Sequence, residues 1–473
     1  MALTGGMSLA LSLLSAVPEA SARVRPPATP RGVHAVAIDS NTAIVLWKPV
    51  RGASRYRVYR DGALHARRKH AVSVLDVSLA TGGRRRYAVA ACRRSRCSPR
   101  SAAVSVPTLG PCSGVTIGAS QDIQATIDAN PPGTTLCLQA GTFALTAPLV
   151  PKSGDVLWGA SGTVLTGQDV TRQAIVGRTG LQDDVTVRGL RIEHFAGPGA
   201  AVSPGLSWLV EHNVIANNAD VGLQVASGMT ARGNSILRTG RLGVGGHDVS
   251  DVTIEANRIA ENNTKGLYVD RAGGTKLLYA TNVLFQGNRV LYNAGNGLHC
   301  DTDCNHVSFV GNVVTDNFGK GISYETSWNG VIRGNTVIGN DARAAWLPLP
   351  YGSNLRLNDS QGVEISGNVV KATVPGTNGI TLYDRDRGAG PLGTYRIAND
   401  YIHDNTVYMH AGGASGLAGT AHNPTAPSAG VRFENNTYYV DEPGLYFDWG
   451  SDPISWGAWR AAGNDVTGSF LPW

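Results

Sequence analysis

The stretch "FVGNVV", residues 309–314, has an apolar pair, then Gly-Asn, then a second apolar pair, and related stretches recur along the chain. Asparagine takes the equivalent place at positions 213, 234, 257, 288, 312, 335, 368, 405 and 436, with early intervals of 21, 23, 31, 24 and 23 residues. A period of this length that is rich in β-branched side chains is typical of a parallel β-helix solenoid. We expect the asparagines to stack as an amide ladder that holds one corner of the coils.

The composition also predicts an all-β protein of more than one domain. The chain has 473 residues and 59 glycines, which is too long for one ordinary core and too rich in turn residues for a helical protein. An apolar run followed by Ala20-Ser21-Ala22 predicts a signal peptide over residues 1–22. No later stretch approaches the roughly 18 apolar residues of a membrane span. We therefore expect a secreted, extracellular protein with no membrane span.

The six cysteines form three close pairs, which are Cys92/Cys97, Cys112/Cys137 and Cys300/Cys304. An even count in an exported chain fits disulfides, because the compartment is oxidising. The same argument favours a disulfide over metal binding at Cys300 and Cys304.

The charge is divided unevenly between two parts of the chain. Residues 24–108 carry 17 lysines and arginines against three aspartates, a net charge of +14, whereas residues 109–473 carry 23 against 31 acidic residues, a net charge of −8. The basic part can associate with anionic cell-wall material, while the larger part predicts no cationic groove. We do not expect nucleic acid as a partner of an exported chain.

The basic part reads as a small β-sandwich over residues 30–108, after a linker at 23–29. Short strand patterns alternate with glycine-rich turns at sandwich spacing. Trp47 in "VLWKPV", the hairpin "YRVYRDG" and Tyr87 in "RRYAVAA" resemble a fibronectin type III module. The resemblance implies a spacer rather than a catalytic domain.

The coils are expected to span residues 111–440. The segment "SQDIQATIDANPPG" places Ile123 and Ile127 on one helical face, and such a helix can plug the open end of the stack. Residues 441–473 are expected to cap the other end, with Trp449, Trp456, Trp459 and Trp473 as the apolar cover.

Three fragments, "GLYVDRAGG" (266–274), "GLHCDTDC" (297–304) and "GISYETSW" (321–328), share the pattern Gly-apolar-x-apolar-acid. Their acids and His247 each lie thirteen residues after a ladder asparagine, so we expect one ladder of His247, Asp270, Asp301 and Glu325, with rungs about 4.8 Å apart. Strand alternation points Tyr268 and His299 outward with the acids, and we expect both, with Asp303 and Trp328, to contact substrate. Neighbouring carboxylates raise one another's pKa, which makes this ladder a candidate acid–base site.

Insertions are expected to build walls beside this ladder. The 31-residue interval adds residues after Asp270 and can bring Lys276 over the acids. Longer intervals after Asn335 can raise the opposite wall, with Trp328, Trp346, Tyr351 and Tyr383 available to stack on sugars. Asp303 lies close enough to the acids that bound Ca²⁺ stays open as an alternative.

Residues 111–440 resemble the right-handed parallel β-helix, pectate-lyase-like superfamily. Within it, Gly-Leu-x-x-Asp followed one coil later by Gly-Ile-x-x-Glu is similar to the paired acids of β-helix glycoside hydrolases such as the family 120 xylosidases. This resemblance implies that Asp301 is the nucleophile and Glu325 the acid/base. Asp270 is then expected to hold charge or substrate, with retention of configuration because adjacent rungs lie close together.

Three hypotheses on function follow from these patterns. The first is a secreted glycoside hydrolase that cleaves a polysaccharide or oligosaccharide with Asp301 and Glu325. The second is a polysaccharide lyase or uronate C5-epimerase, in which Lys276 or the auxiliary residue His247 takes the C5 proton. The third is a non-catalytic β-helix that binds glycans or surfaces, with the acids as Ca²⁺ ligands. In each case we expect a monomer with a carbohydrate partner.

Overall fold

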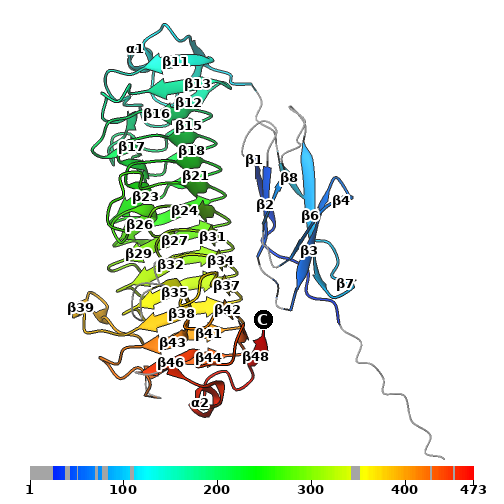
Figure 1. Cartoon of the computed structure of the whole chain (residues 1–473). Helices are drawn as coiled ribbons and strands as arrows, with labels where there is room; N and C mark the ends of the chain where they lie inside the picture. The colour runs from blue at the N-terminus through cyan, green and yellow to red at the C-terminus, as the bar shows by residue number, and fades with distance from the viewer. Residues whose placement is uncertain are drawn as a thin grey trace, which may run out of the picture.

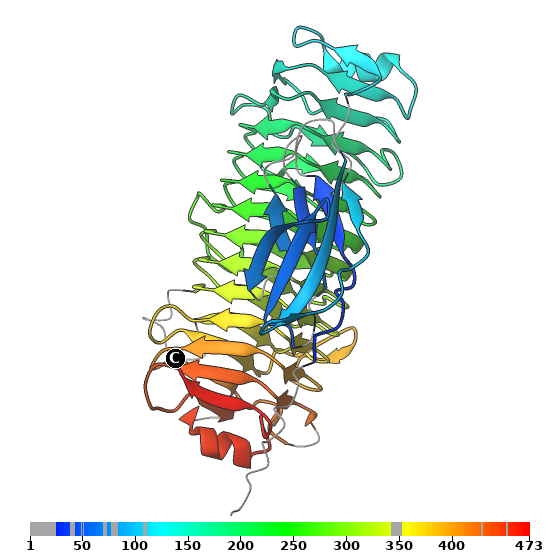
Figure 2. The same ribbon diagram turned by 90° about the vertical axis from the view of Figure 1, so that its right-hand side faces the viewer.

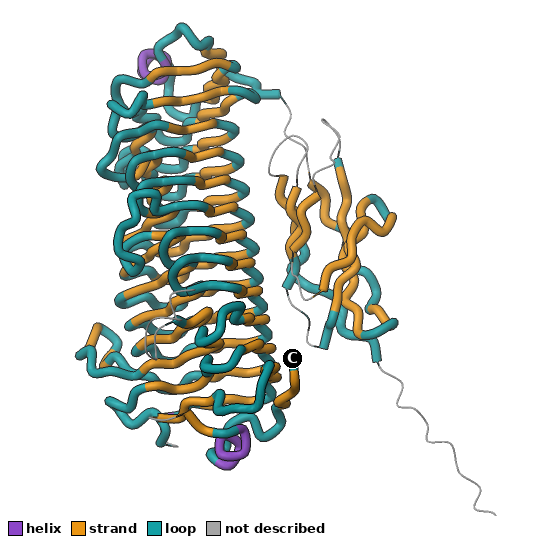
Figure 3. The backbone as a smooth tube through the Cα atoms, in the orientation of Figure 1, coloured by secondary structure: helices purple, strands orange, loops and turns teal. Residues whose placement is uncertain are grey.

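The structure is a computed structural model that describes residues 25–37, 43–48, 50, 52–69, 73–76, 84–106, 111–341, 352–426, 429–450 and 453–473. The predicted signal peptide, Trp346 and Tyr351 lie outside these residues. From β9 onward the chain winds through three long sheets, and each typical coil contributes one short strand to each sheet (Figures 1 and 3). Neighbouring strands in these sheets pair in parallel, apart from β47 at one end.

The first sheet contains β9 (Val115–Ile117), β10 (Thr135–Leu138), β12 (Val156–Gly159), β15 (Thr186–Arg188), β18 (Leu209–Glu211), β21 (Thr230–Arg232), β24 (Ser250–Glu255), β27 (Thr281–Gln286), β30 (Ser308–Val310), β33 (Val331–Arg333), β36 (Glu364–Ser366), β41 (Tyr401–His403) and β44 (Arg432–Glu434). The second sheet contains β11 (Gly141–Ala144), β13 (Thr163–Thr166), β16 (Arg191–Glu193), β19 (Val214–Ala216), β22 (Ser235–Leu237), β25 (Arg258–Ala260), β28 (Arg289–Leu291), β31 (Val313–Thr315), β34 (Thr336–Ile338), β37 (Val369–Lys371), β42 (Thr406–Met409), β45 (Thr437–Val440) and β48 (Ser469–Pro472).

The third sheet, called the site sheet below, contains β14 (Ile175–Val176), β17 (Ala200–Ser203), β20 (Val221–Gln224), β23 (Leu242–His247), β26 (Gly273–Leu278), β29 (Leu298–Asp301), β32 (Ile322–Glu325), β35 (Ser353–Asn358), β38 (Asn378–Tyr383), β43 (Ser415–Ala418), β46 (Phe447–Gly450) and β47 (Pro453–Ile454). A short hairpin of β39 (Ala389–Gly390) and β40 (Gly393–Thr394) projects from the coil that follows β38.

One corner of the coils is held by the predicted asparagine ladder. The Nδ2 group of each asparagine from position 213 to position 405 donates to the Oδ1 atom of the next asparagine, with distances between 2.9 and 3.1 Å. These side chains are almost fully buried, and each also bonds to backbone groups. The ladder is therefore confirmed, and it satisfies polar groups that would otherwise be costly to bury.

A second ladder lies at the other end of the strands of the second sheet and was not predicted. Asn262, Asn293, Asn317 and Asn340 are linked by Nδ2–Oδ1 bonds of 2.8 Å. Each of them follows a member of the first ladder by five residues, from Asn257 onward. This second spacing was present in the sequence and could have been found there.

Both ends of the stack are covered. The helix α1 (Ile123–Ala129) lies at the N-terminal end and buries Ile123 and Ile127, as expected (Figure 1). At the other end, α2 (Trp456–Ala461) buries Trp459, whose ring stacks on Phe447 at 4.9 Å. The coil continues past the predicted boundary at residue 440, because β46 and β48 still pair in parallel with β43 and β45.

The tail differs from the expectation in one residue. Trp473 leaves the end of the stack and packs beside Tyr408, 5.5 Å between ring centroids, on the outside of the second sheet. Within the described residues, no helix is both long and apolar enough for a membrane crossing.

The N-terminal module is an antiparallel two-sheet sandwich. One sheet contains β1 (His34–Ala37), β2 (Ala43–Leu46) and β5 (Ser73–Asp76), and the other contains β3 (Arg55–Arg60), β4 (Ala63–Lys69), β6 (Arg85–Arg93), β7 (Arg96–Cys97) and β8 (Val104–Val106). Trp47, Tyr56 and Tyr87 lie in the shared core, where the sequence pattern placed them. The fibronectin type III assignment stays a prediction.

The module lies beside the stack, on the side away from the site-sheet strands β23, β26 and β29 (Figures 1 and 2). His34 Nε2 lies 3.3 Å from Glu255 Oε2 at the end of β24. Leu46 packs so closely on Gly287 that a side chain there would collide with it. The module therefore contacts a different face from the one that carries the predicted acids.

Candidate active site

The carboxylates of Asp301 and Glu325 lie side by side on the outer face of the site sheet. The parallel register of β29 and β32 pairs these two residues directly. One oxygen of each carboxylate and one nitrogen of His299 lie within 4.8 Å of one another. The predicted adjacency of Asp301 and Glu325, called the carboxylate pair below, is therefore observed.

The prediction that Asp270 belongs to the same ladder is wrong. The residue of β26 that pairs with Asp301 is Leu278, and His247 pairs with Leu278 in turn. The extra residues of the long coil, 261–272, precede β26, whereas only residues 238–241 precede β23. Two segments of this coil fit the strand pattern, "GLYVD" at 266–270 and "GGTKLL" at 273–278. Counting thirteen residues from Asn257 selected the first segment, whereas the strand of the site sheet is the second.

Asp270 nevertheless reaches the site from this insertion. Lys320 Nζ lies 2.8 Å from Asp270 Oδ1, and Asn296 Nδ2 donates to the same oxygen at 3.1 Å. Burial raises the pKa of Asp270, but the charge and hydrogen bond of Lys320 outweigh it and hold that pKa well below its usual range. Neither Lys320 nor Asn296 was predicted, because their positions just before the strands carry no recurring pattern.

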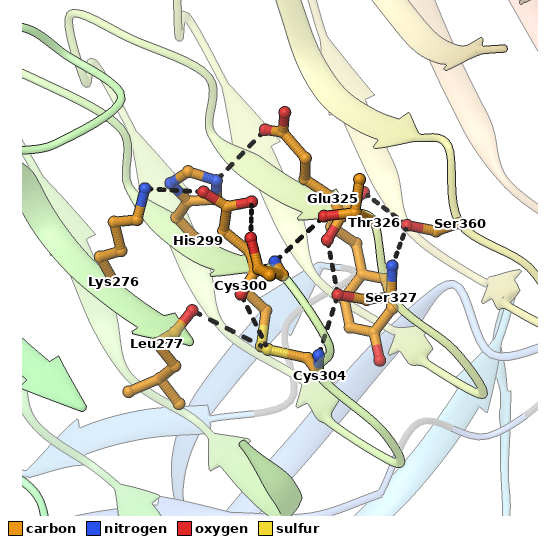
Figure 4. Close-up of a disulfide and its surroundings, with 12 residues drawn as sticks. Lys276, Leu277, His299, Cys300, Cys304, Glu325, Thr326, Ser327 and Ser360 are labelled. Atoms are coloured by element: carbon orange, nitrogen blue, oxygen red, sulfur yellow. Dashed lines mark hydrogen bonds and ion pairs between the residues drawn. A yellow bond between two sulfur atoms is a disulfide. The ribbon is translucent and has the colours of Figure 1, made fainter. Parts of the chain in front are cut away.

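Asp301 is held by a lysine that the sequence did suggest. Lys276 Nζ donates to Asp301 Oδ2 at 2.7 Å and to the backbone oxygen of Asp270 at 2.7 Å. Thr302 Oγ1 donates to the other oxygen of Asp301. Figure 4 shows Lys276 and Glu325 on opposite sides of His299. Lys276 thus reaches the carboxylate pair, although from β26 itself and not from an inserted wall.

Glu325 is surrounded by donors. Asn358 Nδ2 and Arg387 Nη1 each donate to Oε1 at 2.8 Å, and His299 Nε2 lies 3.5 Å from Oε2. Burial raises the pKa of Glu325, yet His299, Lys320 and Arg387 together lower it well below the usual range. Glu325 is therefore an anion at neutral pH and is the ionised member of the carboxylate pair.

His299 lies on the outer face of β29 but beneath the surface, with 1% of its area exposed. Its Nδ1 atom lies 3.3 Å from Asn296 Nδ2. A ring this deeply buried cannot stack on a sugar, so the prediction that His299 contacts substrate is not supported. Its position beneath both carboxylates instead suits it to orient Glu325.

A wall rises beside the pair, as the long interval between Asn368 and Asn405 predicted. The segment from Arg385 to Tyr395, which includes the β39–β40 hairpin, brings Arg387 to Glu325. Arg385 Nε and Arg387 Nη1 lie 3.6 and 3.9 Å from Asp359 Oδ2. The interval indicated this insertion, but its arginines stand about 60 positions from Glu325 in sequence and no pattern linked them.

The predicted sugar contacts on this side are occupied by protein. Tyr395 Oη donates to Asp303 Oδ1 at 2.6 Å, and its ring packs on Trp328 at 5.2 Å. Trp328 is only 4% exposed. The guanidinium groups of Arg356 and Arg385 lie 5.1 and 4.9 Å from the ring centre of Tyr383. Asp303 and Trp328 therefore anchor the wall, and Tyr383 packs against Arg385 of the wall and Arg356 of β35.

Asp359, directly after the strand residue Asn358, is a buried acid that the sequence did not single out. None of its surface is exposed, and burial raises its pKa to about 6 despite Arg385 and Arg387 nearby. It lies behind the arginines and has no access to a ligand.

The Cys300–Cys304 disulfide forms, as do Cys92–Cys97 and Cys112–Cys137. Cys300 and Cys304 are fully buried, and their bond closes the turn directly after Asp301 (Figure 4). The prediction of three disulfides is confirmed.

Two further predicted residues lie away from the pair. His247 is exposed and packs edge-on against Tyr279, 4.9 Å between centroids, with β26 between it and Asp301. Tyr268 is 67% exposed in the insertion that precedes β26. Neither residue lies against the carboxylates.

The donor set does not suit Ca²⁺. This ion prefers six to eight oxygen ligands, whereas the close group here is His299, Asp301 and Glu325. Lys276 and Arg387 already hold the two carboxylates, and a divalent cation would have to displace them.

Comparison with known proteins supports the architecture. The sequence matches the family described as a right handed beta helix region over residues 156–275 and 269–348. These ranges include β26, β29 and β32, and so they include the whole carboxylate pair. No curated protein shows a significant match to the chain.

Several solved structures resemble the chain at low sequence identity. The A-module of the mannuronan C-5 epimerase AlgE6 from Azotobacter vinelandii gives a TM-score of 0.52 at 16% identity and covers 76% of this chain and 96% of that one. PfbA, a surface adhesin of Streptococcus pneumoniae, gives 0.47 at 10% identity, covering 76% and 93%. The family 28 exopolygalacturonase of Yersinia enterocolitica gives 0.43 at 11% identity, covering 91% and 100%. The coils therefore form a right-handed parallel β-helix, as predicted, and the likeness to the epimerase module extends to the fold alone.

Proposed function

We propose that the chain is a secreted carbohydrate-active enzyme, a glycoside hydrolase that retains configuration and uses Asp301 and Glu325. The observation that carries this proposal is the spacing of the pair on adjacent, directly paired strands. Retaining glycosidases keep their two carboxyl groups about 5 to 5.5 Å apart, and inverting ones about 6.5 to 9.5 Å. The three disulfides support an oxidising compartment outside the cytoplasm.

The contacts favour the opposite division of roles from the one that the resemblance implies. A nucleophile has to be ionised, and Glu325 is held as an anion by Asn358, Arg387 and His299. Asp301 has one cationic partner, Lys276, and is held by fewer donors than Glu325. We therefore assign Glu325 as the nucleophile and Asp301 as the acid/base.

The reaction then proceeds in two steps, which are formation and hydrolysis of a covalent glycosyl-enzyme intermediate. A Glu325 oxygen bonds to the anomeric carbon, the glycosidic bond breaks, and the proton of Asp301 passes to the departing oxygen. Water next bonds to the same carbon, its proton passes to Asp301, and Glu325 leaves as a carboxylate. Two inversions give net retention.

Azide rescue tests this assignment. Glu325→Ala should lose turnover, and azide should restore product as a glycosyl azide of inverted configuration, because azide replaces the nucleophile. Asp301→Ala should yield a glycosyl azide of retained configuration. The opposite pair of configurations would return the roles to those that the resemblance implies. The matched control is Asp316→Asn, an exposed acid on another corner, which should keep full activity.

A polysaccharide lyase or uronate C5-epimerase is the second candidate, favoured by the lysines and arginine around the pair. The fold neighbour AlgE6 is described as a mannuronan C-5 epimerase. Against it, Lys276 is engaged with Asp301 and His247 lies off the pair. Assaying neutral and acidic oligosaccharides for new reducing ends, for absorbance of unsaturated uronate and for C5 inversion by proton NMR separates the two activities. Binding without any product would favour the non-catalytic hypothesis.

A further inference from the structure

A concave site lies on the outer face of the site sheet, next to the carboxylate pair on its N-terminal side. This cavity measures about 320 Å³, which is at the small end of ligand sites and suits one or two sugar units. Lys276 and Leu278 form one edge of it. Because Lys276 Nζ also bonds to Asp301, the cavity and the pair share a side chain and adjoin each other.

The cavity is cationic, although the β-helix as a whole is acidic. Its lining includes Arg241, Arg271, Lys276 and His247, and no aspartate or glutamate of the described residues lines it. The net charge of −8 over residues 109–473 therefore does not describe this face. The prediction of no cationic groove from that total is wrong locally.

The positive charge of the lining is only partly neutralised. Arg241 bonds to Asp220 at 2.6 and 3.2 Å but keeps 40% of its side chain exposed. Arg271 is exposed and makes no ion pair with any other described residue. Of the other acids close by, Asp270 is held by Lys320, and Asp248 is exposed after His247.

The floor of the cavity is bare backbone. Gly245 stands in register between Gln224 on one strand and Lys276 on the next. A Cβ atom at Gly245 would lie 3.0 Å from Gln224 Oε1 and 3.5 Å from Val221 Cγ1. The missing side chain therefore leaves room beside the amide of Gln224, which can bond to a sugar, and next to the Lys276 ammonium group that holds Asp301.

We propose that this cavity is a subsite for an anionic sugar, one that carries a carboxylate or a sulfate group, next to the bond that the carboxylate pair cleaves. Guanidinium groups bind such anions with two parallel hydrogen bonds, and Arg271 is available to do so. The inference rests on the proposed function in one respect, which is that the cleaved bond lies at Asp301 and Glu325. It deepens that function by naming an acidic glycan as the substrate class.

Direct binding tests the subsite without requiring turnover. The full chain with Glu325→Gln would be titrated calorimetrically with three trisaccharides, which are a uronate, a sulfated and a neutral one. We expect at least one acidic trisaccharide to bind about tenfold more tightly than the neutral one, and the advantage to shrink at high ionic strength. The two acidic ligands distinguish carboxylate from sulfate recognition.

Two variants locate the effect. Arg271→Gln should remove most of the preference for the acidic ligand and leave the neutral ligand unaffected, while Gly245→Leu should weaken both by filling the floor. Arg289→Gln makes the same charge change on the second sheet, at an exposed position of β28, and should change nothing. Equal affinity for acidic and neutral ligands, or an Arg271→Gln variant with unchanged preference, would overturn the subsite. Selective binding by a wild-type chain that cleaves no glycan would overturn only the hydrolase.

Discussion

The two asparagine corners and the outer face of the site sheet are built on the same coils and use them differently. At the first corner, each rung from Asn213 to Asn436 is the same neutral side chain, and each amide bonds to the next. On the site sheet, successive rungs are His247, Leu278, Asp301, Glu325 and Asn358. Identical rungs satisfy one another along the stack, whereas the unlike rungs do so only between Glu325 and Asn358 and otherwise bond to other side chains, which form the site.

The partners of the unlike rungs come from both the strands and the irregular segments. Lys276, which holds Asp301, comes from β26 itself, whereas Arg387, which holds Glu325, comes from the wall beyond β38. A regular repeat therefore supplies the scaffold, and a break in its period supplies one of the charged groups. The following predictions test this division of labour, starting with the largest expected effect.

Removing the end of the ladder should have the most severe consequence. Truncation after Val440 deletes β46, α2 and β48 and exposes Phe433 and Tyr438, which are buried in the intact chain. An open strand edge with apolar area invites intermolecular pairing. We expect aggregation in size-exclusion chromatography with light scattering. A truncated chain that stays monomeric, with unchanged melting, would refute the role of the cap.

Replacing a single asparagine of the first ladder should also destabilise the chain strongly. Asn312 accepts two bonds from Asn288 and donates to Phe285 O and Asn335 Oδ1. Because each buried group left unpaired costs about 1–3 kcal/mol, Asn312→Ala should lower the free energy of unfolding by roughly 3–5 kcal/mol in a urea titration. Asn305→Ala, at a partly exposed amide that accepts one side-chain bond, should cost less than about 1 kcal/mol. Equal losses would mean that the ladder has no special weight.

On the site sheet, removing Arg387, which holds Glu325 from the wall, should change catalytic activity more than it changes the free energy of unfolding. Arg387→Gln removes a cation that lowers the pKa of Glu325. If Glu325 has to be ionised, the acidic limb of the profile of kcat/KM against pH should move to higher pH, with about a tenfold loss of activity near that limb. Arg333→Gln, which breaks an exposed pair with Glu364, serves as the control. An unmoved limb would show that Arg387 does not set the charge of Glu325.

A smaller effect is expected from the acid behind the wall. The pKa of Asp359 is raised from 3.8 to about 6 by burial, so at intermediate pH the folded chain holds a proton that the unfolded chain has lost. This contribution to stability is complete below pH 3.8 and is lost as the pH rises through about 6. The melting temperature of Asp359→Asn should therefore fall less than that of the wild type over this range. Parallel curves would contradict the assignment.

The smallest effect on turnover is expected from the N-terminal module. It contacts the first sheet through His34 and Leu46, on a different face from the pair. Deleting residues 23–108 should leave turnover of a soluble oligosaccharide within about twofold and reduce retention on insoluble anionic material. Loss of turnover on the soluble substrate would place the module in the site.

The repeat was predictable because its physics is local and periodic. The asparagine spacing and the pairing of Asp301 with Glu325 both follow from counting along coils of similar length. Counting failed where one coil changed length, because two segments fitted the strand pattern and only packing decides between them. The placement of Asp270 was lost for that reason.

The electrostatics of the site were not predictable in the same way. Four groups, Lys320, Asn296, Asp359 and Arg387, reach the site from turns or from the wall, where position depends on tertiary contacts. From the sequence alone, the neighbouring acids are expected to raise one another's pKa. In the structure, the cations and amides around Glu325 and Asp270 lower the pKa of both residues. The direction of these shifts could be inferred only once the opposite charges were in place.

The first asparagine ladder ends on an aspartate, and this gives the stack a built-in length. Asp465 Oδ1 accepts from the backbone and side-chain nitrogens of Asn436, and Oδ2 accepts from Tyr438 and Trp459. An asparagine both receives and passes on a hydrogen bond, whereas a carboxylate only receives. Asp465 thus terminates the directional row of side-chain hydrogen bonds, because its carboxylate has no hydrogen to donate to a further rung.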